Sequence, residues 1–82
     1  MDNKLFEDVC IQLVAKETGL DPLQIYIVWL VKVLGNNKAM VSTAVSGDGL
    51  YFEVTYNGNK DEVYVDKYVK ETNTCYKPGD LV

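Results

Sequence analysis

The chain lacks histidine and arginine altogether. Histidine is the commonest general base, the commonest metal ligand and the usual partner of a serine or cysteine nucleophile, so its absence argues against most enzymes. Arginine makes the bidentate contacts that recognise phosphate and guanine, and the eight lysines are scattered instead of forming a basic stripe. We therefore expect no enzymatic activity, no cofactor and no direct nucleic-acid contact.

Cysteine is scarce. Cys10 and Cys75 are the two cysteines of the chain, and their separation fits no zinc-binding pattern. Cys10 falls on the apolar stripe of a predicted helix, which is typical of a buried, reduced thiol. A disulfide between the two residues is the less favoured alternative, because we expect a reducing compartment.

Long apolar runs are also missing. The most apolar stretch, residues 25–31, is too short to cross a bilayer. The first residues have neither the basic start nor the apolar run of a secretory signal. These features predict a soluble, cytoplasmic protein without membrane contact.

The composition is that of one small globular domain. Of the 82 residues, 48% are hydrophobic and 24% are charged, which argues against disorder. Twelve acidic residues against eight basic ones give a net charge of −4, which keeps a small domain soluble. We expect a single domain over residues 1–82.

Three runs rich in asparagine, glycine and aspartate punctuate the middle of the chain, at Gly35–Lys38, Ser46–Gly49 and Asn57–Lys60. Asparagine and glycine tolerate the positive φ angles of hairpin turns, so these runs predict a four-stranded antiparallel meander. The expected strands span about residues 24–34, 38–45, 50–56 and 61–66. Residues 24–34 also admit a helix after Asp21-Pro22, but their β-branched and aromatic composition favours a strand.

The N-terminal segment predicts an amphipathic helix over about residues 3–18. Apolar residues recur there at three- and four-residue spacing. The stripe consists of Leu5, Phe6, Val9, Cys10, Leu13 and Val14. Asp2 or Asn3 can cap the start, and Gly19 is suited to end the helix. With a short helical turn near residues 67–72 and an irregular tail, the fold class is α+β, with the helix packed on one side of the sheet.

One helix can cover only one side of such a sheet, yet the first strand is apolar on both sides. Lys32 favours an outward Tyr26 row, whereas simple turn registers favour an outward Trp29 row, and the sequence leaves both open. In either case aromatic and acidic side chains gather on the far side, as is typical of an interface, unless the tail folds back over them. The candidate partner-binding residues are Tyr26, Trp29, Leu30, Tyr51, Glu53, Glu62 and Tyr64.

Acidic residues give two weaker signals. Oxygens of Asn57, Asn59, Asp61 and Glu62 could hold a hard cation, which makes a carboxylate-based metal-binding protein a remote alternative. They lack the EF-hand pattern, so we expect a solvated hairpin tip and no metal site. Glu53 would lie opposite Glu62 across a two-residue turn and be offset from it across a four-residue turn, which we favour.

Several strings carry a family resemblance. They are Tyr26-Ile27-Val28-Trp29, Asn36-Asn37-Lys38-Ala39, Ser42-Thr43, Asp48-Gly49 and residues 51–58. Over about residues 24–68 the chain resembles a family of small uncharacterised proteins of phages and prophages of Gram-positive bacteria. That family has no established catalytic or binding residues to assign to positions of this chain.

The resemblance implies a context, because short phage accessory proteins often bind and block a bacterial protein, including CRISPR nucleases. The leading expectation is a phage-type protein-binding module, an anti-CRISPR-like inhibitor of a host or defence protein in the bacterial cytoplasm. The alternative is a homodimeric structural or regulatory protein that self-associates through the same face.

Overall fold

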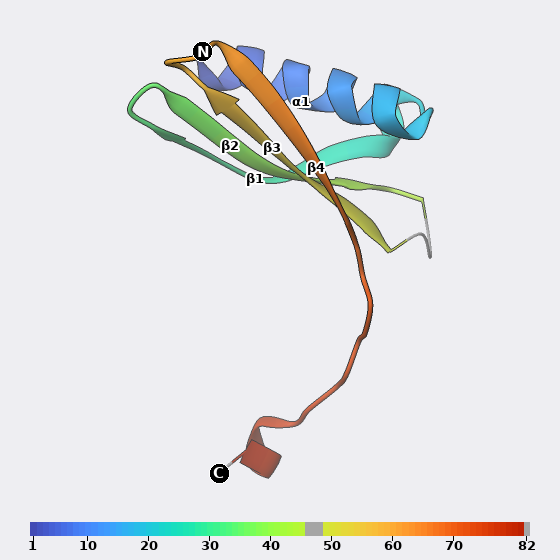
Figure 1. Ribbon diagram of the computed structural model, residues 1–82. Helices are drawn as coiled ribbons and strands as arrows, with labels where there is room; N and C mark the ends of the chain where they lie inside the picture. The colour runs from blue at the N-terminus through green and yellow to red at the C-terminus, as the bar shows by residue number, and fades with distance from the viewer. Residues whose placement is uncertain (46–48, 82) are drawn as a thin grey trace.

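A computed structural model describes residues 1–45 and 49–81. A single helix, α1 (Asn3–Thr18), crosses one face of an antiparallel sheet whose strand order is β1-β2-β3-β4 (Figure 1). The strands are β1 (Ile25–Val33), β2 (Asn36–Thr43), β3 (Leu50–Asn57) and β4 (Glu62–Val69). Short 3-10 helices, η1 (Pro22–Gln24) and η2 (Pro78–Leu81), precede β1 and end the chain. This arrangement confirms the predicted α+β fold; the second predicted turn run lies largely outside the described residues.

Helix α1 has the ends that its sequence predicts. The Asp2 carboxylate accepts a hydrogen bond from the Leu5 amide at 2.8 Å, which satisfies one of the free amides of the first turn. Gly19 ends the helix in the left-handed conformation at φ +73°, and its amide donates to the Ala15 carbonyl. Between these caps Phe6, Cys10 and Val14 of the apolar stripe are buried against the sheet, whereas Leu5 at its start is exposed.

The core lies between α1 and the face of the sheet that it covers, here called the inner face. Strand residues alternate between the two faces, so every second side chain of β2 is buried, and Phe52 and Val54 are buried in the middle of β3. The fully buried apolar residues are Phe6, Cys10, Val14, Ala39, Val41, Phe52 and Val54, with Ile25 at the margin. Helix α1 packs mainly on β1 and β2, and Val63 and Val65 of β4 remain half-buried.

The first hairpin turn lies earlier than predicted. Leu34 and Gly35 form the turn, and β2 starts at Asn36, whereas the sequence placed the turn at Gly35–Lys38 and the strand at 38–45. Leu34 adopts φ +57°, a left-handed conformation that asparagine or glycine usually provides. The prediction was wrong here because it assumed that the two asparagines bend the chain.

Both asparagines instead use their side chains to fix other segments. The buried Asn37 amide nitrogen donates to the Met1 carbonyl at 3.0 Å, which holds the N-terminus against the sheet. The Asn36 side-chain oxygen accepts from the Gly58 amide at 3.0 Å, which joins the first and third turns. Side-chain acceptors of this kind replace backbone partners at irregular positions.

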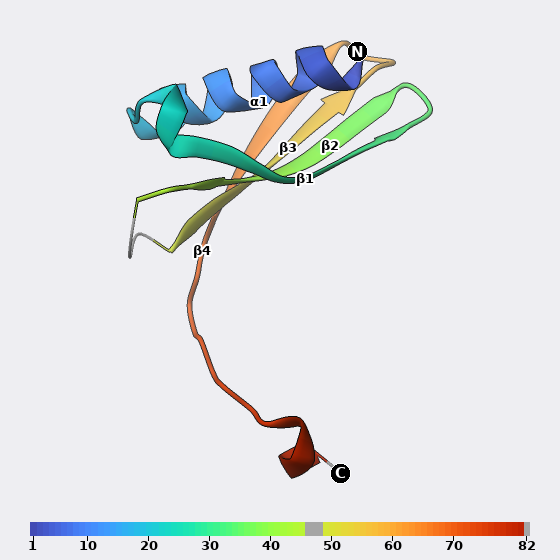
Figure 2. The same ribbon diagram turned by 180° about the vertical axis from the view of Figure 1, so that it is seen from behind.

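The C-terminal segment differs from its prediction in position. Strand β4 runs through Val69, so no helical turn occupies residues 67–72, and the 3-10 turn of this segment, η2, lies at Pro78–Leu81. Pairing of Lys67 and Tyr68 with Phe52 and Tyr51 of β3 overrides the local tendency to turn. Figures 1 and 2 both show the last residues leading away from the sheet, so the tail does not cover the far face.

Candidate interaction surface

A β-bulge in β1 decides which residues of that strand face away from α1. Between Ile27 and Trp29 the register against β2 shifts by one, which leaves Val28 as an extra residue. Because side chains alternate along a strand, the extra residue exchanges the two faces. Tyr26 therefore points outward before the bulge and Trp29 points outward after it. The outward Tyr26 row is therefore correct for the first half of the strand, and the outward Trp29 row is correct for the second half.

The face of the sheet opposite α1, here called the outer face, is apolar over β1. Five large side chains of this strand are 41–63% exposed: Tyr26, Val28, Trp29, Val31 and Val33. Met40 of β2 lies opposite Trp29 and extends this area toward the middle of the sheet. Leu30, one of the candidate contacts, lies on the inner face instead and packs against the core.

Tyrosines extend the outer face over β3 and β4. The rings of Tyr51 and Tyr68, which are opposite each other in the ladder, stack with centroids 5.0 Å apart and planes 9° apart. Tyr64 lies two alternate positions before Tyr68 on β4, with Asp66 between them on the same face, and its hydroxyl donates to the Glu62 carboxylate at 2.5 Å. Tyr68 is not among the predicted contact residues because residues 67–72 are predicted to form a turn, although the alternation of Tyr64, Asp66 and Tyr68 indicates one face.

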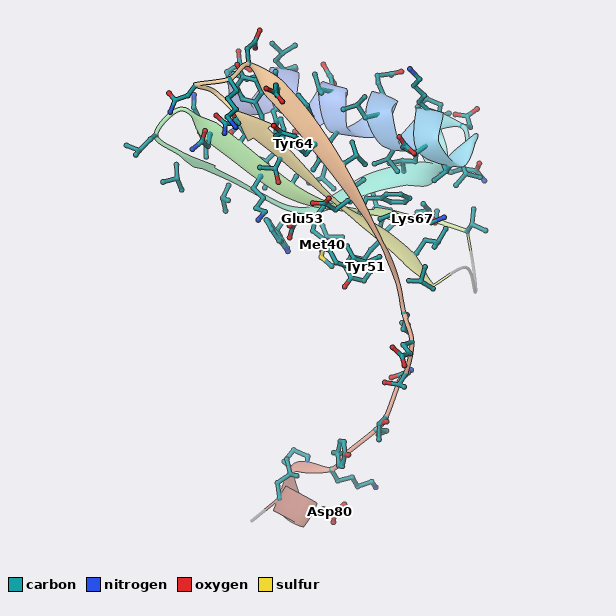
Figure 3. The ribbon with its side chains drawn as sticks, in the orientation of Figure 1. Met40, Tyr51, Glu53, Tyr64, Lys67 and Asp80 are labelled. Carbon is teal, nitrogen blue, oxygen red and sulfur yellow. The ribbon has the colours of Figure 1, made fainter. Side chains whose placement is uncertain are left out.

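Acidic side chains lie among these tyrosines. The loop between β3 and β4 has four residues, which confirms the favoured alternative and places Glu53 opposite Asp66 instead of Glu62. Lys38 of β2 forms an ion pair with Glu53, Nζ to Oε1 at 3.1 Å. Figure 3 shows Met40, Tyr51 and Glu53 together on the side away from α1. The three carboxylates, Glu53, Glu62 and Asp66, outnumber the two ammonium groups of Lys38 and of Lys70 just after β4, so this half of the outer face is acidic.

A hollow of about 340 Å³ lies at the end of the outer face where β4 finishes. Its walls include Val28 beside the bulge, Met40, and Tyr51 of the tyrosine stack. The other lining residues are Ser42, Val45, Gly49, Leu50 and Lys70. Its volume is at the lower end of the range of small-molecule pockets, and its lining is mostly apolar.

Three of the four possible cation ligands at the β3–β4 turn, Asn57, Asp61 and Glu62, accept hydrogen bonds from the protein itself. The Asn57 side-chain oxygen accepts from the amides of Asn59 and Lys60, and Asp61 accepts from the Tyr56 hydroxyl at 2.9 Å. Within residues 1–45 and 49–81, no three acidic or cysteine side chains form a group suited to a metal ion. These hydrogen bonds describe a closed hairpin tip.

The same bonds act on tyrosine protonation. Donation to Asp61 raises the pKa of Tyr56, with smaller contributions from burial and from the charge of Asp61. Donation to Glu62 raises the pKa of Tyr64 in the same way. Both hydroxyls are therefore held in the neutral, donating form.

The fold and the outer face together define a small α+β protein with one sheet face uncovered. The chain belongs to a family of unknown function, DUF6275, whose model matches residues 3–78. No curated protein and no solved structure matches the chain. The family match includes α1, all four strands and most of the segment after β4. No helix in the described part of the chain is long and apolar enough to span a bilayer.

Proposed function

We propose that this protein is a non-enzymatic protein-binding module and that the outer face is its contact surface. The observation that supports this proposal is the row of five apolar side chains on β1 that neither α1 nor the C-terminal segment covers. Since each is about half-buried already, covering all five would contribute on the order of 4–8 kcal/mol before the cost of association. That is enough for a specific complex, because Trp and Tyr concentrate binding energy at interfaces.

The face is a better contact surface than either edge of the sheet. Edge strands that accept another strand are usually long and regular, and proteins block them with bulges and inward-pointing charges. Strand β1 has the bulge at Val28 and places Lys32 on its inner face, after the bulge. Strand β4 places Lys67 on its inner face, opposite Phe52. Both edges thus have devices that disfavour strand addition.

The charges on the outer face define the partner. A complementary surface has an apolar patch over β1 and basic groups facing Glu53, Glu62 and Asp66. On the resemblance to phage and prophage proteins, the partner is a bacterial host or defence protein, of which a CRISPR nuclease is one kind. The protein would act as an inhibitor in the cytoplasm of the bacterial host.

Affinity capture from a lysate of a Gram-positive host, followed by titration of the captured protein, tests the proposal. Trp29→Ala and Tyr64→Ala remove contact area from the two halves of the outer face and should each weaken binding at least tenfold, about 1.4 kcal/mol. Leu23→Ala is the matched control, because Leu23 is exposed on η1 away from the sheet face. Unchanged affinity in both face variants would exclude the outer face as the contact surface.

Face-to-face pairing of two copies is the other use of the same apolar row. Sedimentation equilibrium separates the two functions, because pairing through the face gives a wild-type dimer that Trp29→Ala dissociates. A wild-type protein that captures a host partner while this variant does not, without any change in oligomeric state, supports the heterologous complex.

A further inference from the structure

The segment after β4, residues 70–81, is here called the C-terminal arm, and it is exposed along its whole described length. The Lys70 amide bonds to the Gly49 carbonyl at the base of the arm, and the Asp80 amide bonds to Lys77 within its last turn. Two large apolar side chains, Tyr76 and Leu81, are 67% and 70% exposed. Ordering such a segment costs conformational entropy that contacts within its own chain do not offset.

The direction of the arm takes it away from its own body. It continues from β4, as Figures 1 and 2 show. Between Lys70 and Lys77 the sequence has neither glycine nor proline, and Thr72, Thr74 and Tyr76 favour an extended backbone. Six residues of extended chain place Tyr76 roughly 20 Å from the base of the arm. The family match extends to residue 78, so most of the arm belongs to the family domain.

The hollow on the outer face lies at the same end of the sheet as the base of the arm, because Lys70 lines the hollow. A two-fold axis near this end would allow each arm to pass over the hollow of the other copy. Reaching the hollow of its own copy would require a sharp reversal within the extended residues. The positions of the arm and the hollow therefore favour a second copy as the occupant.

We infer that two copies of this protein exchange their C-terminal arms, each placing Tyr76 in the hollow between Val28, Met40 and Tyr51 of the other. Aromatic rings pack well against methionine sulfur and against other rings, so the lining suits a tyrosine. Lys77, next to Tyr76, brings a positive charge toward the acidic half of the outer face. The Trp29–Val33 end of that face stays open, so the exchange does not depend on the proposed function.

Sedimentation equilibrium of the full chain and of a chain ending at Val69 provides the first test. The full chain should form a dimer and the shortened chain a monomer with unchanged circular dichroism, since the arm is not part of the core. Tyr76→Ala should raise the dimer dissociation constant at least tenfold, whereas Thr72→Ala, an exposed control on the same arm, should not. A full chain that stays monomeric across the concentration range overturns the inference.

Photo-cross-linking from Cys75 provides the second test. Cys10 is buried, and its burial raises its pKa to about 12, so a maleimide at neutral pH labels Cys75 alone. A benzophenone attached there should cross-link to Met40 or Tyr51 of the other copy. In a mixture of isotopically heavy and light chains, a cross-link between two copies gives heavy–light pairs that mass spectrometry detects. Cross-links confined to one copy would show that the arm folds back on its own chain and would overturn the exchange.

The two proposals fail separately. Trp29→Ala and Tyr64→Ala should leave the dimer intact, because neither residue lines the hollow. A chain that ends at Val69 should still capture the host partner through the open end of the face. A dimer that persists without the arm and dissociates in Trp29→Ala is paired through the face, which contradicts arm exchange.

Discussion

At the scale of single residues, the asparagines and glycines of this chain do more than bend it. Gly58 carries out two functions, because its amide donates to the Asn36 side chain and its α-carbon lies against the backbone of Gly35. The first and third turns thus hold each other at one end of the sheet. The sequence identified both turns, but it gave no sign that they touch, since that contact depends on the twist of the strands between them.

Replacing Gly58 by alanine tests this contact. The added Cβ would lie 2.2 Å from the Gly35 carbonyl oxygen, so the two backbones must separate. We expect Gly58→Ala to lower the free energy of unfolding by about 1–3 kcal/mol in urea denaturation. Gly35→Ala is the control, because its Cβ would meet no atom within 4 Å. Equal stability of the two variants would contradict the turn-to-turn contact.

At the scale of elements, the sequence predicted the helix, the strand count and the antiparallel order, because the periodicities and turn residues that define them are local. The sequence did not predict the bulge in β1, because the residue at the bulge, Val28, is as typical of a regular strand as its neighbours. Because this strand is apolar on both sides, either side could face the core, and both Tyr26 and Trp29 were candidates for the outer face. Leu30 was placed among the candidate contacts for the same reason, and the bulge turns it toward the core.

Deletion of Val28 tests the assignment of the bulge. Removing the extra residue restores the regular alternation of Ile27 and Trp29 without moving any other side chain to the opposite face. The variant should fold cooperatively and lose less than about 1.5 kcal/mol in thermal or urea unfolding. Deletion of Thr55, in the regular ladder of β3, reverses the faces of the residues beside it and should abolish cooperative unfolding. Comparable losses in the two deletions would contradict a bulge at Val28.

At the scale of the whole molecule, the fold has two layers, α1 and the sheet, and the described residues place no third layer on the outer face. The described residues form one α-helix, which buries most of the inner face and leaves Val63 and Val65 of β4 half-buried. The sequence analysis predicted this imbalance from the number of elements. It did not predict the straight C-terminal arm, because nothing in a local pattern shows where a tail goes after its strand ends.

The stability of the whole molecule should depend on alkaline pH. Burial raises the pKa of Cys10 from near 9 to about 12, and hydrogen bonds raise the pKa values of Tyr56 and Tyr64. Above pH 9 the unfolded chain loses protons that the folded chain retains. The free energy of unfolding therefore has its highest value below that pH and falls as the pH rises toward 12. For Cys10 alone the slope is about 1.4 kcal/mol per pH unit.

Urea unfolding at several pH values between 8 and 11 measures this slope. Cys10→Ala leaves a small cavity and should be less stable than the wild type near pH 8, but its pH profile should be flatter, so the difference should shrink as the pH rises. A wild-type profile as flat as that of the variant would show that the thiol titrates normally in the folded chain.

The off-centre position of α1 has a dynamic consequence. The helix packs mainly on β1 and β2, whereas β4 is held by its ladder to β3 and by half-buried valines. Stability is therefore graded across the sheet, and the cheapest partial opening is the detachment of β4 as a unit. Because the arm continues from this strand, any pull on the arm acts on the most weakly anchored part of the fold.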